Sequence, residues 1–148
     1  MKAMIDAPGA GDWIMSRASG VFAEARDHAF SNHDDDGEIL GGFALTSYLG
    51  GSYTVHMAGE GSRWCSRELM WLVFHYAFKQ LGCYKLFAPV RSDSYEVVSM
   101  DLRAGWALEA TLYDAYEKGV HMLVLSMTKD TCPWLGYTPR QYRDGRAA

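Results

Sequence analysis

The sequence predicts an α+β fold, with a mixed and mostly antiparallel sheet flanked by about three helices. Three observations support the α+β class. Segments with the alternation of strands outnumber segments with helical periodicity. Short turns join several neighbouring strands, which makes those strands antiparallel. One long helical segment separates two strands, which indicates a single crossover.

Composition limits the class of protein further. The chain has 148 residues, of which 49% are hydrophobic and 22% charged, and this excludes a disordered or fibrous chain. Its length predicts one domain over residues 1–148, with a polar tail from about residue 136. The net charge of −4 argues against nucleic-acid binding, which needs a basic surface. No segment suits a membrane span or a signal peptide, so a cytoplasmic location is expected.

The first half of the chain predicts one helix and three strands. Apolar residues share one helical face over 12–27, and Asp12 can cap the start of that helix. Strands are predicted over 28–33, 38–49 and 52–57. The first two are joined by an Asp-Gly turn at Gly37, and the last two by the glycine pair at 50–51.

The second half predicts two helices, one strand and a hairpin. The strongest helix runs to Leu81, with Ser66 as its N-cap and Gly82 just past its end. A strand over 84–90 and a helix ending before Gly105 follow. A closing hairpin is predicted over 106–116 and 120–128.

The loop between the third strand and the long helix is a candidate anion site. Helix N-termini present unpaired backbone N–H groups, and Arg63 and Arg67 lie on either side of this helix start. Such a loop suits a pyrophosphate. The alternative is an ordinary loop with two solvated arginines, because it matches no phosphate-binding glycine fingerprint.

The order of elements and two motifs resemble the GNAT superfamily of acyl-CoA-dependent N-acyltransferases. The loop reads Arg-Trp-Cys-Ser-Arg-Glu over 63–68, as in small bacteriophage-encoded members, and Asp-Leu-Arg-Ala-Gly-Trp over 101–106 resembles the last helix and the step after it. The resemblance covers roughly residues 38–135. It implies a GNAT-like fold, acetyl-CoA as donor, a primary amine of unknown identity as acceptor and no metal. For a phage-encoded member, the cytoplasm would be that of the host.

The resemblance also implies which residues hold the coenzyme. The implied set follows the strand end, the loop, the helix start and the start of the last helix: Met57, Gly61, Ser62, Arg63, Trp64, Cys65, Ser66, Arg67 and Ser94. Ser62 and Trp64 stand where the family has glycines, and Ser94 stands where it has an asparagine. These departures favour an alternative function, a catalytically inactive accessory protein that binds a host or virion protein.

Two residues are candidates for proton transfer. His56 lies on the strand leading into the loop, on the face away from Tyr53 and Val55, and histidine titrates near neutral pH. The alternative is a core histidine held by one hydrogen bond. Asp101 stands where the family often has a tyrosine that protonates the departing thiolate.

The aromatic residues near the C-terminus predict an assembly. Trp134, Tyr137 and Tyr142 follow the last strand, and no later element is predicted to cover them. Exposed aromatic surface is commonly buried by a partner, so a two-fold homodimer is predicted through this segment.

Overall fold

A computed structural model describes residues 1–61 and 63–143 and confirms the mixed α+β class. The elements are β1 (Lys2–Ile5), α1 (Ala10–Arg17), β2 (His28–His33), β3 (Ile39–Thr46), β4 (Ser52–Gly59), α2 (Arg67–His75), β5 (Lys85–Arg91), α3 (Tyr95–Ala104), β6 (Ala107–Glu117) and β7 (Val120–Thr128), with a π-helical turn (Tyr76–Gln80) after α2 and two short 3-10 turns (Pro133–Gly136, Arg140–Tyr142) after β7. No helix in the described part of the chain has the length and apolar character needed to cross a membrane.

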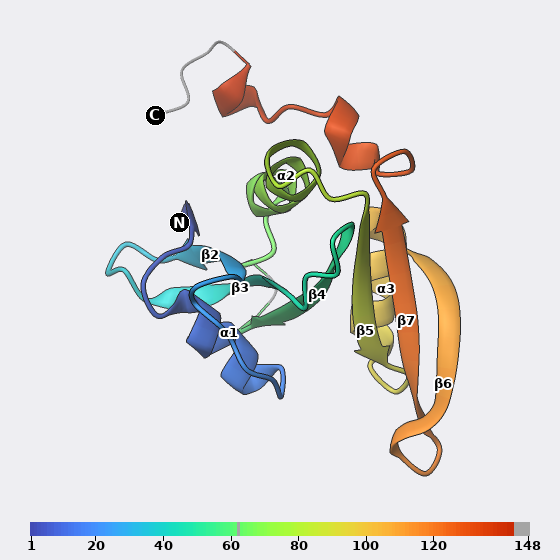
Figure 1. Ribbon diagram of the computed structural model, residues 1–148. Coiled ribbons are helices and arrows are strands. Elements are labelled where there is room, and N and C mark those ends of the chain that lie inside the picture. The colour runs from blue at the N-terminus through green and yellow to red at the C-terminus, as the bar shows by residue number, and fades with distance from the viewer. Residues whose placement is uncertain (62, 144–148) are drawn as a thin grey trace.

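The seven strands form one sheet in the order β1-β2-β3-β4-β5-β7-β6. Every neighbouring pair is antiparallel except β4 and β5, which are parallel because α2 connects them as a crossover. Figure 1 shows β1 to β4 and β5 to β7 as two halves that diverge where β4 meets β5.

Helices cover the two faces of the sheet unequally. On one face, α1 packs against β2, β3 and β4 through a small cluster that includes Ile14, Met15 and Ala44. On the other face, α2 and α3 cover the main core, which extends from Phe30 to Met127.

The N-terminal region differs from its prediction. Helix α1 ends at Arg17 rather than near residue 27, because Ser19 adopts the left-handed conformation at φ 60° and Gly20 follows. The chain then runs through turns to β2. Strand β1 was not predicted, since a four-residue strand at a chain end has too little alternation to be recognised, yet it pairs with β2 along its whole length.

Helix α2 has the predicted start and end signals. Ser66 is the N-cap, and its Oγ accepts a hydrogen bond from the backbone N–H of Leu69 at 3.1 Å. The helix does not stay α-helical to its end, because the N–H of Leu81 reaches the carbonyl of Tyr76, as in a π-helix. Gly82 then takes a positive φ of 70°.

Strands β4 and β5 pair only where they begin. Their register joins Ser52 to Lys85, Tyr53 to Leu86 and Thr54 to Phe87, whereas β4 continues to Gly59 and β5 to Arg91. Past Thr54 the two strands separate, and Pro89 lies in this part of β5. A proline is tolerated here because its missing N–H would face the gap rather than a paired strand.

The segment after β7 packs against α2, so the prediction that its aromatic residues lack a cover is wrong. The Trp71 indole donates to the Tyr137 carbonyl at 2.6 Å and stacks on the Tyr142 ring with centroids 4.8 Å apart. Tyr142 donates to Glu68 at 2.6 Å, and Trp134 donates to the Ala104 carbonyl at 2.9 Å. These contacts leave the aromatic rings partly buried against their own chain.

Candidate active site

The gap between β4 and β5 contains a cavity of about 500 Å³, here called the splay cavity. It is lined from both strands, from the end of α1 and from the closing hairpin: Arg17, Ala18, Ser19, Val55, His56, Met57, Ala88, Pro89, Val90, Arg91, Ser94, Val97, Tyr116 and Met122. Three of the predicted site residues, His56, Met57 and Ser94, therefore meet here. They come together because two parallel strands stop pairing after three residues.

His56 occupies the predicted face of its strand. It pairs with Ala44, which belongs to the α1 cluster, whereas its neighbours Val55 and Tyr53 belong to the main core. Burial lowers the pKa of His56, and the Asp27 carboxylate opposes this by raising it. Because burial is the larger effect, the ring is neutral at neutral pH and can accept a proton.

A second cavity, of about 710 Å³, lies between the β4–α2 loop and α3 and is here called the loop cavity. Four predicted coenzyme residues line it, namely Met57, Gly61, Trp64 and Cys65. The loop cavity and the splay cavity share Met57 and Val97, so they adjoin. These two neighbouring cavities, which extend from the strand gap to the loop and α3, are here called the path.

Trp64 fixes the shape of the loop. Its indole is buried against two glycines that face each other across β3 and β4, Gly41 and Gly59, and a side chain at either position would overlap the ring. Its backbone carbonyl accepts a hydrogen bond from the buried side-chain amide of Asn32. Trp64 aligns with a position where the family that the sequence resembles has a glycine. In this structure the two glycines Gly41 and Gly59 leave space for its indole ring.

Two arginines lie at the outer end of this path. A cavity of about 280 Å³ is lined by Arg67, Arg103 and Trp134 among others, and Arg103 also lines the loop cavity. Arg63, by contrast, is exposed and lines none of these three cavities. Arg103 was not predicted as a site residue, because only the packing of α3 beside the start of α2 brings it close to Arg67.

Ser66, another predicted coenzyme residue, has a different position. The Ser66 hydroxyl accepts from Leu69 and lies 3.0 Å from the Asn32 amide, so it caps α2 rather than lining a cavity. The backbone at this helix start still presents the first N–H groups of α2 on the loop side. Ser62 lies outside the described residues.

Asp101 is buried in α3 with 2% of its surface exposed, and its Oδ2 has no hydrogen-bond partner among the described residues. Burial raises the pKa of Asp101 to about 7. The nearby Cys65 thiol has a pKa raised to about 12, first by burial and then by the Asp101 charge. Asp101 lines neither the splay cavity nor the loop cavity, so it lies beside the path rather than in it.

The described residues contain no group of three or more His, Cys, Asp or Glu side chains arranged to hold a metal ion. The three cysteines are free. Among the side chains that line the splay cavity, His56 and Tyr116 can exchange protons.

Comparison with known proteins gives a structural likeness without a sequence match. No protein-family model matches this sequence, and no curated protein matches it significantly. Solved structures do resemble it. A mutant of spermidine N-acetyltransferase SpeG from Vibrio cholerae has a TM-score of 0.61 at 15% identity, over 70% of this chain and 65% of that one.

Two further structures extend the likeness over most of the chain. A chimera of the Vibrio cholerae enzyme and hSSAT has a TM-score of 0.70 at 12% identity, over 91% of this chain and 99% of that chain. The Vibrio cholerae spermidine/spermine N-acetyltransferase in complex with manganese ions has a TM-score of 0.65 at 12% identity, over 86% and 91%. The sheet order, the separated β4 and β5 strands and these likenesses show that the chain has the GNAT fold.

Proposed function

We propose that this protein is an acyl-CoA-dependent N-acyltransferase that uses acetyl-CoA and transfers the acetyl group directly to a primary amine. The observation that supports this most strongly is the row of neighbouring cavities from the splay cavity to Arg103. A pantetheine arm is long and narrow and ends in a charged nucleotide. A strand gap that leads to arginines fits both ends of such a molecule.

The backbone of the strand gap supports the same function. Past Thr54, β4 and β5 no longer pair with each other, so N–H and C=O groups on their facing edges lack sheet partners. Amide groups of a pantetheine arm can pair with these edges. A backbone N–H aimed at the thioester oxygen would stabilise the negative charge that develops during attack.

The proton steps use residues of the splay cavity. An alkylammonium must lose a proton before its nitrogen can attack the thioester carbon, and neutral His56 can take that proton directly or through a water. The new C–N bond forms as the C–S bond breaks, and the sulfur leaves as a thiolate. Tyr116 has a phenol in the same cavity and can protonate that thiolate. Asp101 is the alternative donor, as the sequence resemblance implies.

Four finer features belong to the proposal. The chain is a single domain that acts in the cytoplasm, and its relation to bacteriophage-encoded members follows from the loop motif at 63–68. It forms a homodimer. Since the C-terminal aromatics are covered by α2, the support for a dimer is now the exposed apolar side chains along β6, which include Leu108, Leu112 and Tyr113.

One observation favours the second candidate, an accessory protein without catalysis. The buried Trp64 indole fills the space beside Gly41 and Gly59, where a flexible glycine loop would leave backbone amides free to approach a pyrophosphate. Coenzyme binding distinguishes the two functions, because acetyl-CoA should not stabilise an accessory protein that acts through another surface.

The test is the thermal stability of the full chain with and without acetyl-CoA. A ligand at 100 times its dissociation constant stabilises the native state by about 2.7 kcal/mol, so the melting temperature should rise with acetyl-CoA concentration. Calorimetry should give a weaker affinity for Arg67→Ala/Arg103→Ala, with the larger loss at low salt.

Two comparisons complete this test. Arg140→Ala removes an exposed arginine outside the path and should leave affinity unchanged, and Arg63→Ala tests the residue that the sequence predicted. If acetyl-CoA neither stabilises the protein nor binds in calorimetry, the transferase proposal is wrong and the accessory function stands.

A further inference from the structure

The charged side chains that line the splay cavity are all basic. Arg17 comes from the end of α1 and Arg91 from the end of β5, and no aspartate or glutamate is among the lining residues in the described part of the chain. A cationic group of a bound molecule would therefore meet no carboxylate in this cavity. An anionic group would meet a guanidinium, which binds carboxylates well.

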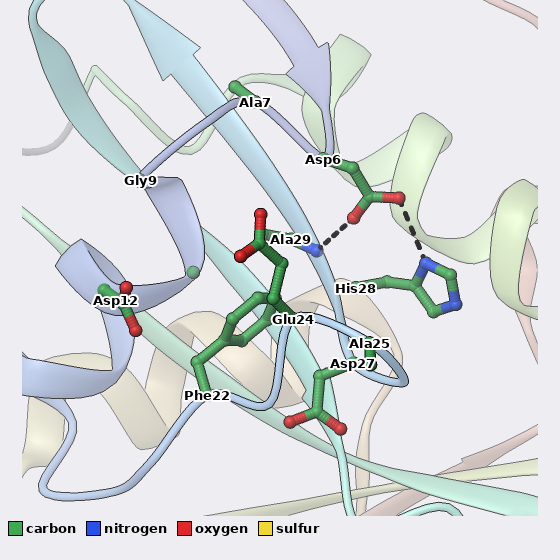
Figure 2. Close-up of a pocket in the computed structure, with 11 residues that line it drawn as sticks. Asp6, Ala7, Gly9, Asp12, Phe22, Glu24, Ala25, Asp27, His28 and Ala29 are labelled. Atoms are coloured by element: carbon green, nitrogen blue, oxygen red, sulfur yellow. Dashed lines mark hydrogen bonds and ion pairs between the residues drawn. The ribbon is translucent and has the colours of Figure 1, made fainter.

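The acidic side chains near α1 surround a different cavity, of about 410 Å³, which Figure 2 shows and which is here called the acidic cavity. They come from the residue after β1, the start of α1 and the turns before β2: Asp6, Asp12, Glu24 and Asp27. The acidic cavity shares no lining residue with the splay cavity. The fold thus keeps these carboxylates out of the lining of the splay cavity.

Asp27 is the carboxylate that acts on His56, and the fold already uses it. Its side chain is buried, its Oδ2 accepts from the N–H of Ala23 at 2.8 Å, and Arg26 lies 3.8 Å from its Oδ1. Asp27 raises the pKa of His56 only against the larger lowering by burial. It therefore does not make the splay cavity a site for cations.

The charge of Arg91 is balanced by the fold. Its Nε and Nη2 donate to the two carboxylate oxygens of Asp93 at 3.0 Å each, and Nη2 lies 3.6 Å from Glu117. Such a bidentate pair occupies the edge of the guanidinium that a further carboxylate would need. Arg91 therefore shapes the cavity without offering it an unbalanced charge.

Arg17 is not balanced in this way. It is exposed, and no carboxylate of the described residues lies within ion-pair distance of it. Its guanidinium carbon lies 3.7 Å from the centre of the Trp13 ring, and its Nη1 donates to the Trp13 carbonyl at 3.1 Å. These contacts orient the group but use one of its N–H donors, so the others remain for an anion.

Ser19 places further donors beside Arg17. It adopts the left-handed conformation at φ 60°, and its backbone N–H donates to no backbone carbonyl among the described residues. Both residues line the splay cavity. A guanidinium with an N–H and a hydroxyl beside it can hold both oxygens of a carboxylate.

The coenzyme and the acceptor would reach His56 from different sides of the sheet. The loop cavity adjoins the splay cavity at Met57 and Val97, which pack on the main core under α2 and α3. Arg17 and His56 lie on the α1 side. A molecule that enters from the α1 side meets Arg17 on its way to His56.

We infer that the acceptor is a small primary amine that carries a carboxylate, with the carboxylate bound by Arg17 and the amine directed toward His56. This inference rests on the proposed transferase function and names the acceptor class of the same site. It predicts discrimination against alkylamines and diamines, because neither offers an anion to Arg17.

Initial rates of acetyl transfer test the acceptor class on the full chain at saturating acetyl-CoA. Glycine, β-alanine and 4-aminobutyrate are each compared with the alkylamine that lacks the carboxylate, and putrescine serves as the diamine. The best amino acid should have a kcat/KM about tenfold or more above that of its alkylamine, since a charge-assisted hydrogen bond is lost without the carboxylate. This preference should shrink as sodium chloride rises. Equal values throughout, or a preference for putrescine, overturn the inference.

Variants of Arg17 assign the preference to its guanidinium. Arg17→Ala should bring the amino acid and its alkylamine to within about twofold of each other, and Arg17→Lys should keep part of the preference because it keeps the charge without the fork of donors. Arg17→Glu should favour putrescine. The control Arg140→Ala removes an exposed arginine outside the cavity and should leave the preference unchanged. A preference for the carboxylate that survives Arg17→Glu overturns the inference.

Calorimetry with acetyl-CoA separates failure of this inference from failure of the proposed function. A protein that binds acetyl-CoA but acetylates none of these amino acids overturns the acceptor class alone. A protein that does not bind acetyl-CoA overturns both.

Discussion

At the scale of single residues, burial decides which side chains can exchange protons near neutral pH. His56 and Asp101 are both enclosed, but burial acts on them in opposite senses because it disfavours the charged form of each. The pKa of His56 falls and that of Asp101 rises to about 7. The former is thus prepared to accept a proton, and the latter retains one well above the ordinary range of a carboxyl group.

His56→Gln should lower turnover at least tenfold, with the affinity for acetyl-CoA little changed, because the side chain is proposed to act on the acceptor amine. In the wild type, activity should fall as pH drops through the lowered pKa of His56. In the variant, this fall of activity at low pH should become smaller. The measurement is a pH–rate profile together with coenzyme titration. Tyr116→Phe provides the matched comparison, and it should lower turnover without changing this fall of activity at low pH. A His56→Gln enzyme with normal turnover would indicate proton transfer through water alone.

Asp101→Asn should stabilise the protein at alkaline pH. Between about pH 4 and pH 7 the unfolded state loses the Asp101 proton while the folded state keeps it, so the free energy of unfolding falls as pH rises through this window. The loss is complete above the folded pKa and is on the order of 2–4 kcal/mol. Asparagine has no titratable proton, so the variant should not show this loss of stability.

Urea unfolding at pH 5 and pH 8 would measure the Asp101 effect. The stability gain from Asp101→Asn should be larger at pH 8, whereas Asp35→Asn, on the exposed turn after β2, should show no such difference. A variant that loses stability equally at both pH values would show that the carboxyl makes a structural contact instead.

At the scale of elements, the close approach of β3 and β4 to the loop depends on the absence of side chains. Gly41 and Gly59 are register partners, and the Trp64 indole lies against both. The end of β4 also lines the loop cavity. The position of the loop therefore depends on the packing of its Trp64 against the sheet.

Gly59→Ala should destabilise the protein by about 1–3 kcal/mol, because its methyl group would overlap the Trp64 ring. Gly51→Ala is the control, since a methyl group there meets no atom within 4 Å. Combining Gly59→Ala with Trp64→Ala should remove most of the additional cost, as a double-mutant cycle by chemical denaturation would show. Additive effects in that cycle would contradict the overlap.

At the scale of the whole molecule, the C-terminal segment joins α2 to α3 and closes the side of the sheet opposite α1. Its contacts include hydrogen bonds to Trp71, His75 and Glu68, and Trp134 reaches the carbonyl of Ala104. The two arginines at the outer end of the path lie beside Trp134. This segment is part of the core rather than an appendage.

Deletion of residues 135–148 should lower the melting temperature by about 5–10 °C, because it removes stacking on Trp71 and two hydrogen bonds from partly buried groups. Calorimetry measures the loss, and light scattering follows the oligomeric state. Tyr142→Phe keeps the ring stack and should cost much less. If the deletion instead leaves the melting temperature unchanged and converts a dimer to a monomer, the segment is an interface.

Local sequence signals predicted most elements and few of their ends. Ser66, Gly82 and Gly105 mark helix boundaries because a cap or a positive φ depends on residues within one turn. The same reasoning extended α1 too far, because apolar periodicity continues past Ser19 while the backbone does not. It also missed β1, whose pairing with β2 spans an intervening helix.

The sequence by itself determined the fold class, the turn positions, the N-cap of α2 and the face of β4 on which His56 lies, since each depends on periodicity and on neighbours in the chain. The predicted cap at Asp12 is wrong, because α1 begins after Gly9 and Asp12 lies inside its first turn. Only the tertiary structure decided where β4 and β5 separate, that Arg103 joins Arg67, and that the final aromatics cover α2. It alone gathered the acidic cavity from three segments. The reason is physical: burial, desolvation and the meeting of charges depend on long-range contacts, which no local pattern encodes.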